Sequence, residues 1–118
     1  MKLREVVDTL GLEVVVGSVD GVEVTGAYAS DMLSDVMAHA KAGSIWVTLQ
    51  IHQNVIAVAV LKELAAVLIV GARRPEDDTA EKAEREGIPV LVTPLTAFEI
   101  AGRLYEMGLR GSPAGEGV

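Results

Sequence analysis

Residues 45–71 read IWVTLQIHQNVIAVAVLKELAAVLIVG, and this stretch decides the fold class. Its pattern predicts a strand over 45–49, a helix over 54–65 that is apolar on nearly all sides, and a second strand over 66–70 that ends at Gly71. A strand, a helix and a strand in this order are typical of a parallel sheet whose crossover helix packs on one face. The polar side chains between the first strand and the helix are those of Gln50, His52, Gln53 and Asn54.

The rest of the chain continues the same alternation. Apolar residues at helical spacing predict helices over 2–10, which stops at Gly11, and over 31–42, which stops at Gly43. A charged helix is predicted over 75–86 with Asp77 or Asp78 as its N-cap, and Thr96 with Glu99 forms a capping box for a last helix that ends at Gly108. The remaining predicted strands are residues 12–16 and 90–92, with a weakly extended segment over 22–29. This order predicts an α/β fold of three layers, a mostly parallel sheet with helices on both faces.

Length, charge and composition restrict the function. The chain has 118 residues, enough for one domain, which we expect to span 1–109, followed by a disordered Gly- and Pro-containing tail over 110–118. Ten Lys and Arg residues against 17 Asp and Glu residues give a net charge of −7, which disfavours binding to nucleic acid. The chain has no Cys, no signal-peptide pattern and no apolar run long enough to span a bilayer. We therefore expect a cytoplasmic protein that binds no membrane.

Polar residues follow each predicted parallel strand. In such sheets ligands bind beyond the carboxyl ends of the strands, which here carry ASD (29–31), QIHQN (50–54), GARR (71–74) and TPLT (93–96). The candidate binding residues at this edge are therefore Ser30, Asp31, Gln50, His52, Asn54, Arg73, Arg74 and Thr93. The alternative is that the short polar side chains cap helices, which is their commoner role, and we expect Asn54 to cap the helix over 54–65.

Three of these features carry alternative interpretations. His52 could act as a base, a ligand donor or a structural residue, and no carboxylate close in the sequence marks it as catalytic. Asp35 and His39 stand one helical turn apart and could share a metal, but such a pair is more often a solvent-exposed helix contact, and we expect no metal. Arg73 and Arg74 could bind a phosphate, or they could pair with the acidic residues next door, Glu76, Asp77 and Asp78.

The chain contains no recognisable catalytic motif. The G-x-S-x-G nucleophile turn, the phosphate-binding G-x-x-x-x-G-K-[ST] loop and the dinucleotide-binding G-x-G-x-x-G turn are all missing from the sequence. We therefore expect a protein that is not an enzyme and that needs no cofactor.

Three motifs carry a resemblance to a known family. They are TG-x-Y-x-SD-x-LS-x-VM-x-x-A, W-x-T-x-Q-x-H-x-N-x-x-AVA and F-E-x-x-G-x-LYE. With these motifs the chain resembles the DRTGG domain family over about residues 1–109. The segment EVTGA at 23–27 stands where the name-giving motif is expected, and of that motif only Thr25 and Gly26 match. We add these two residues to the candidate binding residues.

The resemblance implies a regulatory role. DRTGG domains accompany the amino-terminal region of HPr kinase/phosphorylase, phosphate acetyltransferases and pyrophosphatases with CBS domains, where they are not the catalytic part. We therefore expect a regulatory or interaction domain that forms a homodimer and modulates a partner protein. Its interface would use the helix over 54–65 and the segment 22–29, with Tyr28, Trp46 and Tyr105 as anchors. The alternative is a sensor of a small anion or an adenine nucleotide, which would bind in the crevice at the strand ends.

Overall fold

Helices and strands alternate in the order that the sequence predicts. The structure is a computed structural model that describes residues 1–111. The strands are β1 (Glu13–Val16), β2 (Gly26–Ala29), β3 (Ser44–Thr48), β4 (Ala66–Ile69) and β5 (Val90–Val92). The helices are α1 (Leu3–Leu10), α2 (Leu33–His39), α3 (Asn54–Leu61), α4 (Asp77–Glu86) and α5 (Ala97–Glu106).

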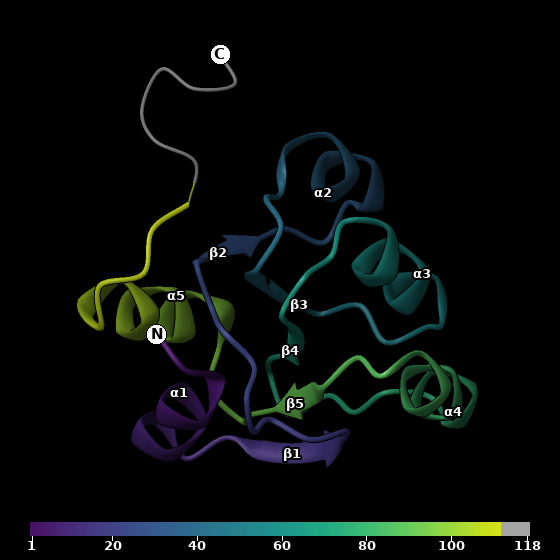
Figure 1. Cartoon of the computed structure of the whole chain (residues 1–118), viewed down its shortest axis with the longest axis horizontal. Helices are drawn as coiled ribbons and strands as arrows, with labels where there is room; N and C mark the ends of the chain where they lie inside the picture. The colour runs from purple at the N-terminus through teal and green to yellow at the C-terminus, as the bar shows by residue number, and fades with distance from the viewer. Residues whose placement is uncertain (112–118) are drawn as a thin grey trace.

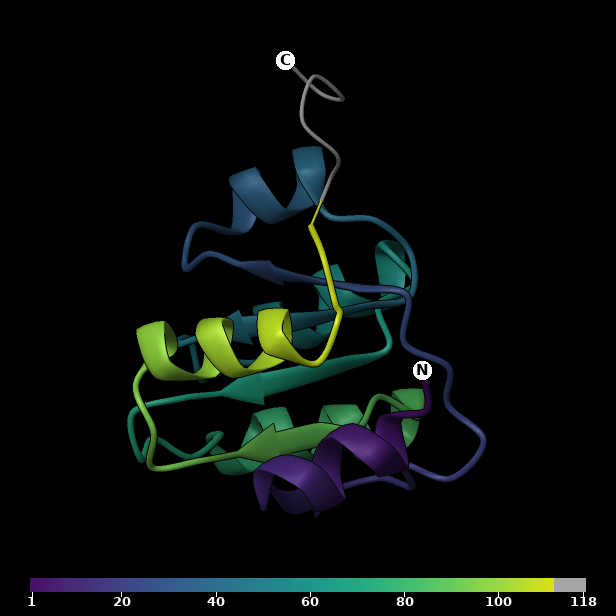
Figure 2. The ribbon, with the colours of Figure 1, turned by 90° about the vertical axis from the view of Figure 1, so that its left-hand side faces the viewer.

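The five strands form one mixed sheet in the order β1-β5-β4-β3-β2. β2, β3, β4 and β5 are parallel to their neighbours, while β1 joins β5 antiparallel at one edge. Every residue of β3, β4 and β5 is buried, which fits runs of Ile, Val and Leu without polar alternation. The sheet is therefore mostly parallel, as predicted, and the four parallel strands all point the same way (Figure 2).

Helices cover both faces of the sheet (Figure 1). One core lies between the sheet and the pair α1 and α5, where Leu3, Val6 and Ile100 pack with the residues of β3 and β4 that point to that face. The other lies under α2, α3 and α4, where Ile56 and Trp46 are fully buried. The three-layer α/β architecture expected from the sequence is thus confirmed.

Several predicted boundaries were wrong, and each error has a local cause. The helix predicted over 31–42 is only α2, because Asp31 binds the end of β3 and Ala40 is extended. The helix predicted over 54–65 ends at Leu61, because Glu63 adopts a left-handed conformation with φ 54° and the Leu64 amide closes the helix end on the Ala59 carbonyl.

One predicted helix cap is wrong and another is confirmed in part. The N-cap of α4 is Glu76 rather than Asp77 or Asp78, and its side chain forms no capping hydrogen bond. Of the capping box predicted for α5, the bond to Thr96 is present: the Thr96 hydroxyl oxygen accepts from the Glu99 backbone amide at 3.3 Å.

Arg110, the first residue of the predicted tail, makes two contacts with the sheet and α5. The Ala27 amide on the free edge of β2 donates to the Arg110 carbonyl oxygen at 3.1 Å, and the Arg110 guanidinium stacks over the Tyr105 ring at 3.6 Å. Arg110 therefore contacts both β2 and α5. Residues 112–118 of the predicted tail lie outside the described residues.

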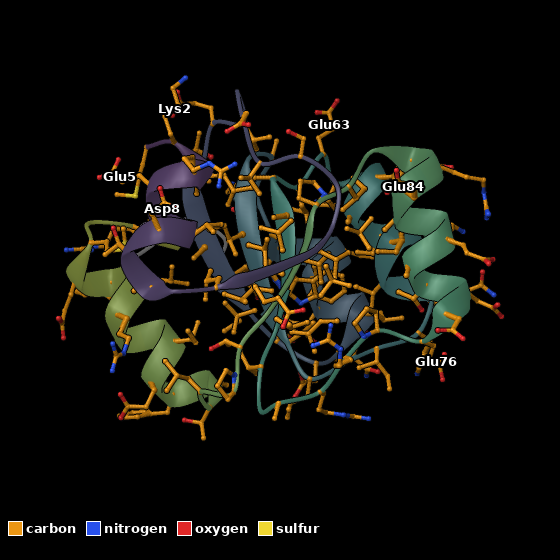
Figure 3. The ribbon with its side chains drawn as sticks, turned by 90° about the horizontal axis from the view of Figure 1, so that it is seen from below. Lys2, Glu5, Asp8, Glu63, Glu76 and Glu84 are labelled. Atoms are coloured by element: carbon orange, nitrogen blue, oxygen red, sulfur yellow. The ribbon has the colours of Figure 1, made fainter. Side chains whose placement is uncertain are left out.

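Charged side chains stand on the outer faces of the helices. Glu5 and Asp8 point away from α1, and Glu84 points away from α4 (Figure 3). In the described part of the chain no helix has the length and apolar character needed to cross a bilayer.

Candidate functional site

The candidate residues divide between the two ends of the parallel strands. Most candidates follow the strands and lie toward their carboxyl edge, as expected: Ser30, Asp31, Gln50, His52, Asn54, Arg73, Arg74 and Thr93. Thr25 and Gly26 precede or begin β2 and lie at the opposite, amino edge. The ten candidate residues therefore do not form one site.

Thr25 and Gly26 hold β2 in place. The Thr25 hydroxyl donates to the Ala42 carbonyl oxygen at 2.9 Å, and its amide donates to the Gly43 carbonyl oxygen. A Cβ on Gly26 would lie 2.6 Å from the Arg110 carbonyl oxygen, so the close pass of the C-terminal segment requires a glycine. The two residues that match the family motif thus have structural contacts at this edge, outside the predicted crevice.

At the carboxyl edge, three candidates converge on the end of β3. One Asp31 carboxylate oxygen accepts from the Thr48 hydroxyl at 2.9 Å and from the Leu49 amide at 2.7 Å. The Gln50 side-chain amide donates to the Asp31 carbonyl oxygen at 2.8 Å. Arg73 reaches the same place from β4 and donates to the Leu49 carbonyl oxygen at 2.8 Å. These contacts join β2, β3 and β4 into one rim.

The other candidates at this edge have different roles. The Ser30 hydroxyl oxygen accepts from the Met32 amide at 3.1 Å, and the buried Thr93 hydroxyl oxygen accepts from the Leu95 amide at 3.3 Å. His52 and Asn54 are exposed, and their side chains form no hydrogen bond within residues 1–111. Asn54 does not cap α3, because it is the first residue of the helix and the N-cap position belongs to Gln53, whose side chain makes no capping bond.

The two arginines do not pair with the acidic residues next to them. Arg74 binds the Glu13 carboxylate with both terminal nitrogens, at 3.1 and 2.7 Å, and so links the segment after β4 to the start of β1. This hydrogen bond lowers the pKa of Glu13 below its ordinary value. The alternative that these arginines pair with Glu76, Asp77 and Asp78 is therefore wrong. Glu13 and Arg74 are far apart in the sequence, so no local pattern indicated this partner.

A pocket opens beside this ion pair. It has a volume of about 310 Å³ and lies beyond the carboxyl ends of β4 and β5. Arg73, Arg74 and Glu13 supply its charges, and Ala72, Val92 and Pro94 supply apolar surface. Of the ten candidate binding residues, Arg73, Arg74 and Thr93 line it.

A second polar cluster joins β2 to α2. The Tyr28 hydroxyl donates to the Asp35 carboxylate at 3.0 Å, and the His39 ring nitrogen Nδ1 lies 3.1 Å from the same carboxylate. Hydrogen bonds, first from Ser30 and then from Tyr28 and His39, lower the pKa of Asp35. The described part of the chain contains no group of three side chains that could hold a metal ion, so Asp35 and His39 have no third ligand there.

One proposed interface anchor is excluded by burial. Trp46 is fully buried, and its indole N–H donates to the Ser30 carbonyl oxygen at 2.8 Å. Tyr28 is half-buried and bound to Asp35, whereas Tyr105 is 59% exposed. Trp46 therefore belongs to the core, where its single polar group is satisfied.

Comparisons with known proteins agree with the fold and name the family. A search of curated proteins finds no match. A solved structure of the CBS and DRTGG domains from the regulatory region of Clostridium perfringens pyrophosphatase, complexed with the activator diadenosine tetraphosphate, is similar with a TM-score of 0.64 and 16% identity. The likeness covers 97% of this chain and 51% of that one, so the chain spans about half of its neighbour. The sequence model of the DRTGG domain matches residues 5–107. The chain therefore belongs to the DRTGG domain family.

Proposed function

We propose that this chain is a regulatory domain without catalytic activity, which forms a homodimer in the cytoplasm and modulates a partner protein. Family membership and the regulatory origin of the similar pyrophosphatase region support a regulatory role. The main support for a homodimer is a stripe of exposed aromatic residues on α5.

The stripe consists of Phe98, Ala101 and Tyr105, which follow one another at the spacing of one helix face. Phe98 is 86% exposed and Tyr105 is 59% exposed. Aromatic rings with this exposure add little to the stability of a monomer, and a cluster of them is typical of an interaction surface. α5 lies over β2 and β3, close to the free edge of the sheet (Figure 2). Large aromatic side chains that become buried on association are the usual anchors of an interface.

A groove adjoins the stripe on the same face. It has a volume of about 150 Å³ and runs between β2 and α5, lined by Ala27, Ala29, Val47, Leu104 and Tyr105 among others. A projecting aromatic ring beside an apolar groove makes the face self-complementary, because a two-fold axis can place the Phe98 ring of each copy against the groove of the other. This face keeps the predicted segment 22–29 but uses α5 in place of the helix over 54–65, which exposes Val60 and Leu61 alone among its large apolar residues. In that helix Val55, Ile56, Val58 and Ala59 are buried in the monomer's own core.

Light scattering on Phe98→Ser and Leu61→Ser variants tests the dimer. Leu61 is a matched control, because it is 65% exposed and lies on α3, on the opposite face of the sheet. We expect a dimer mass at high micromolar concentration for the wild type and for Leu61→Ser, and a monomer mass for Phe98→Ser. A wild-type monomer, or dissociation caused by Leu61→Ser alone, would contradict the proposal.

A second candidate function is sensing of a small ligand at the carboxyl edge. The pocket beside Arg73 and Arg74 favours it, because concave sites at this edge of parallel sheets are the usual ligand sites. The similar pyrophosphatase region is complexed with a nucleotide activator, which makes an adenine nucleotide a reasonable first compound to test. Calorimetric titration with AMP and ATP tests it, and absence of heat with either compound at millimolar concentration counts against an adenine nucleotide.

A further inference from the structure

The pocket at the carboxyl edge contains an ion pair that a ligand can replace. Arg74 and Glu13 meet through two hydrogen bonds, and their side chains are 57% and 58% exposed. Ion pairs with this exposure are weak, because water competes for both groups. The bidentate face of Arg74 is thus occupied by a carboxylate that can be displaced at small cost.

Arg73 offers further donors in the same pocket. Its guanidinium carries several N–H groups, and one of them donates to the Leu49 carbonyl oxygen. No acidic partner of Arg73 is found among residues 1–111. A bound anion could therefore contact Arg73 without breaking an existing ion pair, and the bond to Leu49 holds the arginine at the pocket.

We propose that the pocket binds the phosphate group of a small phosphorylated molecule, which replaces the Glu13 carboxylate on Arg74 and also contacts Arg73. The inference rests on the ligand-sensing candidate and specifies its ligand. A free monocarboxylate has the same geometry as Glu13 and competes poorly with it, because Glu13 is held beside Arg74 at high effective concentration. A phosphate dianion has more charge and three terminal oxygens, enough to engage both arginines.

The size of the pocket indicates an organic body attached to the phosphate. About 310 Å³ exceeds the volume of a phosphate ion and falls at the small end of ligand pockets. Ala72, Val92 and Pro94 give the remaining space an apolar wall. Glu13 lies on the edge strand β1, and Arg74 lies in the segment that follows β4. Ligand binding would therefore break the link between β1 and that segment.

The test is a titration with AMP at constant ionic strength, followed by amide NMR shifts, with adenosine and sodium acetate as comparison compounds. Removing the competing carboxylate in Glu13→Gln should tighten AMP binding by about threefold or more, and Arg74→Gln should weaken it by about tenfold or more. Arg73→Gln should also weaken it. Adenosine and acetate should bind far less tightly than AMP.

Matched controls separate this exchange from a general charge effect. Glu84→Gln and Arg85→Gln make the same charge changes on α4, outside the pocket, and should leave AMP affinity within about twofold of wild type. If AMP binds equally to the wild type and to the Glu13 and Arg74 variants, the exchange is wrong but ligand sensing stands. If the wild type and Glu13→Gln both fail to bind AMP and inorganic phosphate at about 10 mM, the inference is overturned, whatever the mass of the protein by light scattering.

Discussion

Asp31 shows how one side chain can fasten two strands. Its carboxylate follows β2 but accepts hydrogen bonds from the Thr48 hydroxyl and the Leu49 amide at the end of β3. Thr48 is only 1% exposed, so its hydroxyl has little access to water as a substitute acceptor. From the sequence, Asp31 was a candidate for ligand binding, yet its carboxylate is already engaged within the domain.

We expect Asp31→Ala to lower the free energy of unfolding by about 1–3 kcal/mol, because the Thr48 hydroxyl is left buried without its acceptor. Asn54→Ala should change it by less than about 0.5 kcal/mol, since the Asn54 side chain is exposed and caps nothing. His52→Ala should behave like Asn54→Ala. Urea unfolding of the three variants measures the difference, and a larger loss from Asn54→Ala than from Asp31→Ala would show that the rim is wrongly described.

At the scale of elements, α2 is attached to the sheet by one polar contact as well as by apolar packing. Val36 is its one fully buried residue, and the Tyr28 hydroxyl binds Asp35 across from β2. Asp35 has a pKa below its ordinary value of 3.8, chiefly because Ser30 donates a hydrogen bond to it. A carboxylate whose pKa is lower in the folded state stabilises the fold above the unfolded pKa, and this stabilisation is lost as the pH falls through the folded pKa.

We therefore expect the wild type to lose stability as the pH falls below about 4, and Asp35→Asn to lose less over the same interval because the amide side chain of the variant does not titrate. Urea midpoints measured from pH 6 to pH 3 provide the comparison. Equal slopes in the two proteins would mean that the lowered pKa of Asp35 contributes nothing to stability.

The sequence was sufficient for the order and type of the elements but insufficient for their ends. Continuous aliphatic runs identify β3 and β4 because a strand buried on both faces has no other composition. The predicted N-caps of α3 and α4 were wrong because a capping side chain is recognised by residue type alone, and Asn54 and Asp77 each lie one position inside the helix. The sequence predicted the arginine side of the pocket but not Glu13. Glu13 reaches Arg74 because β1 pairs with β5, and no local sequence pattern reveals that pairing.

For the molecule as a whole, we expect no ATP hydrolysis in the presence of Mg²⁺. The sequence contains no phosphate-binding loop, and within residues 1–111 no three acidic or imidazole side chains gather to hold the ion. A phosphate-release assay with purified protein checks this. Reproducible turnover that disappears in Asp31→Ala would contradict a purely regulatory role.

The strand order also determines when the molecule can fold during synthesis. β1 is made early, but its only neighbour in the sheet is β5, the last strand to leave the ribosome. Until residues 90–92 appear, β1 has no partner and β4 has one open edge, although the β2 to β4 part can already form. Pairings that join distant residues form late and slowly. A nascent chain halted before residue 90 therefore exposes strand edges that invite association with other chains, and completion of β5 closes both at once.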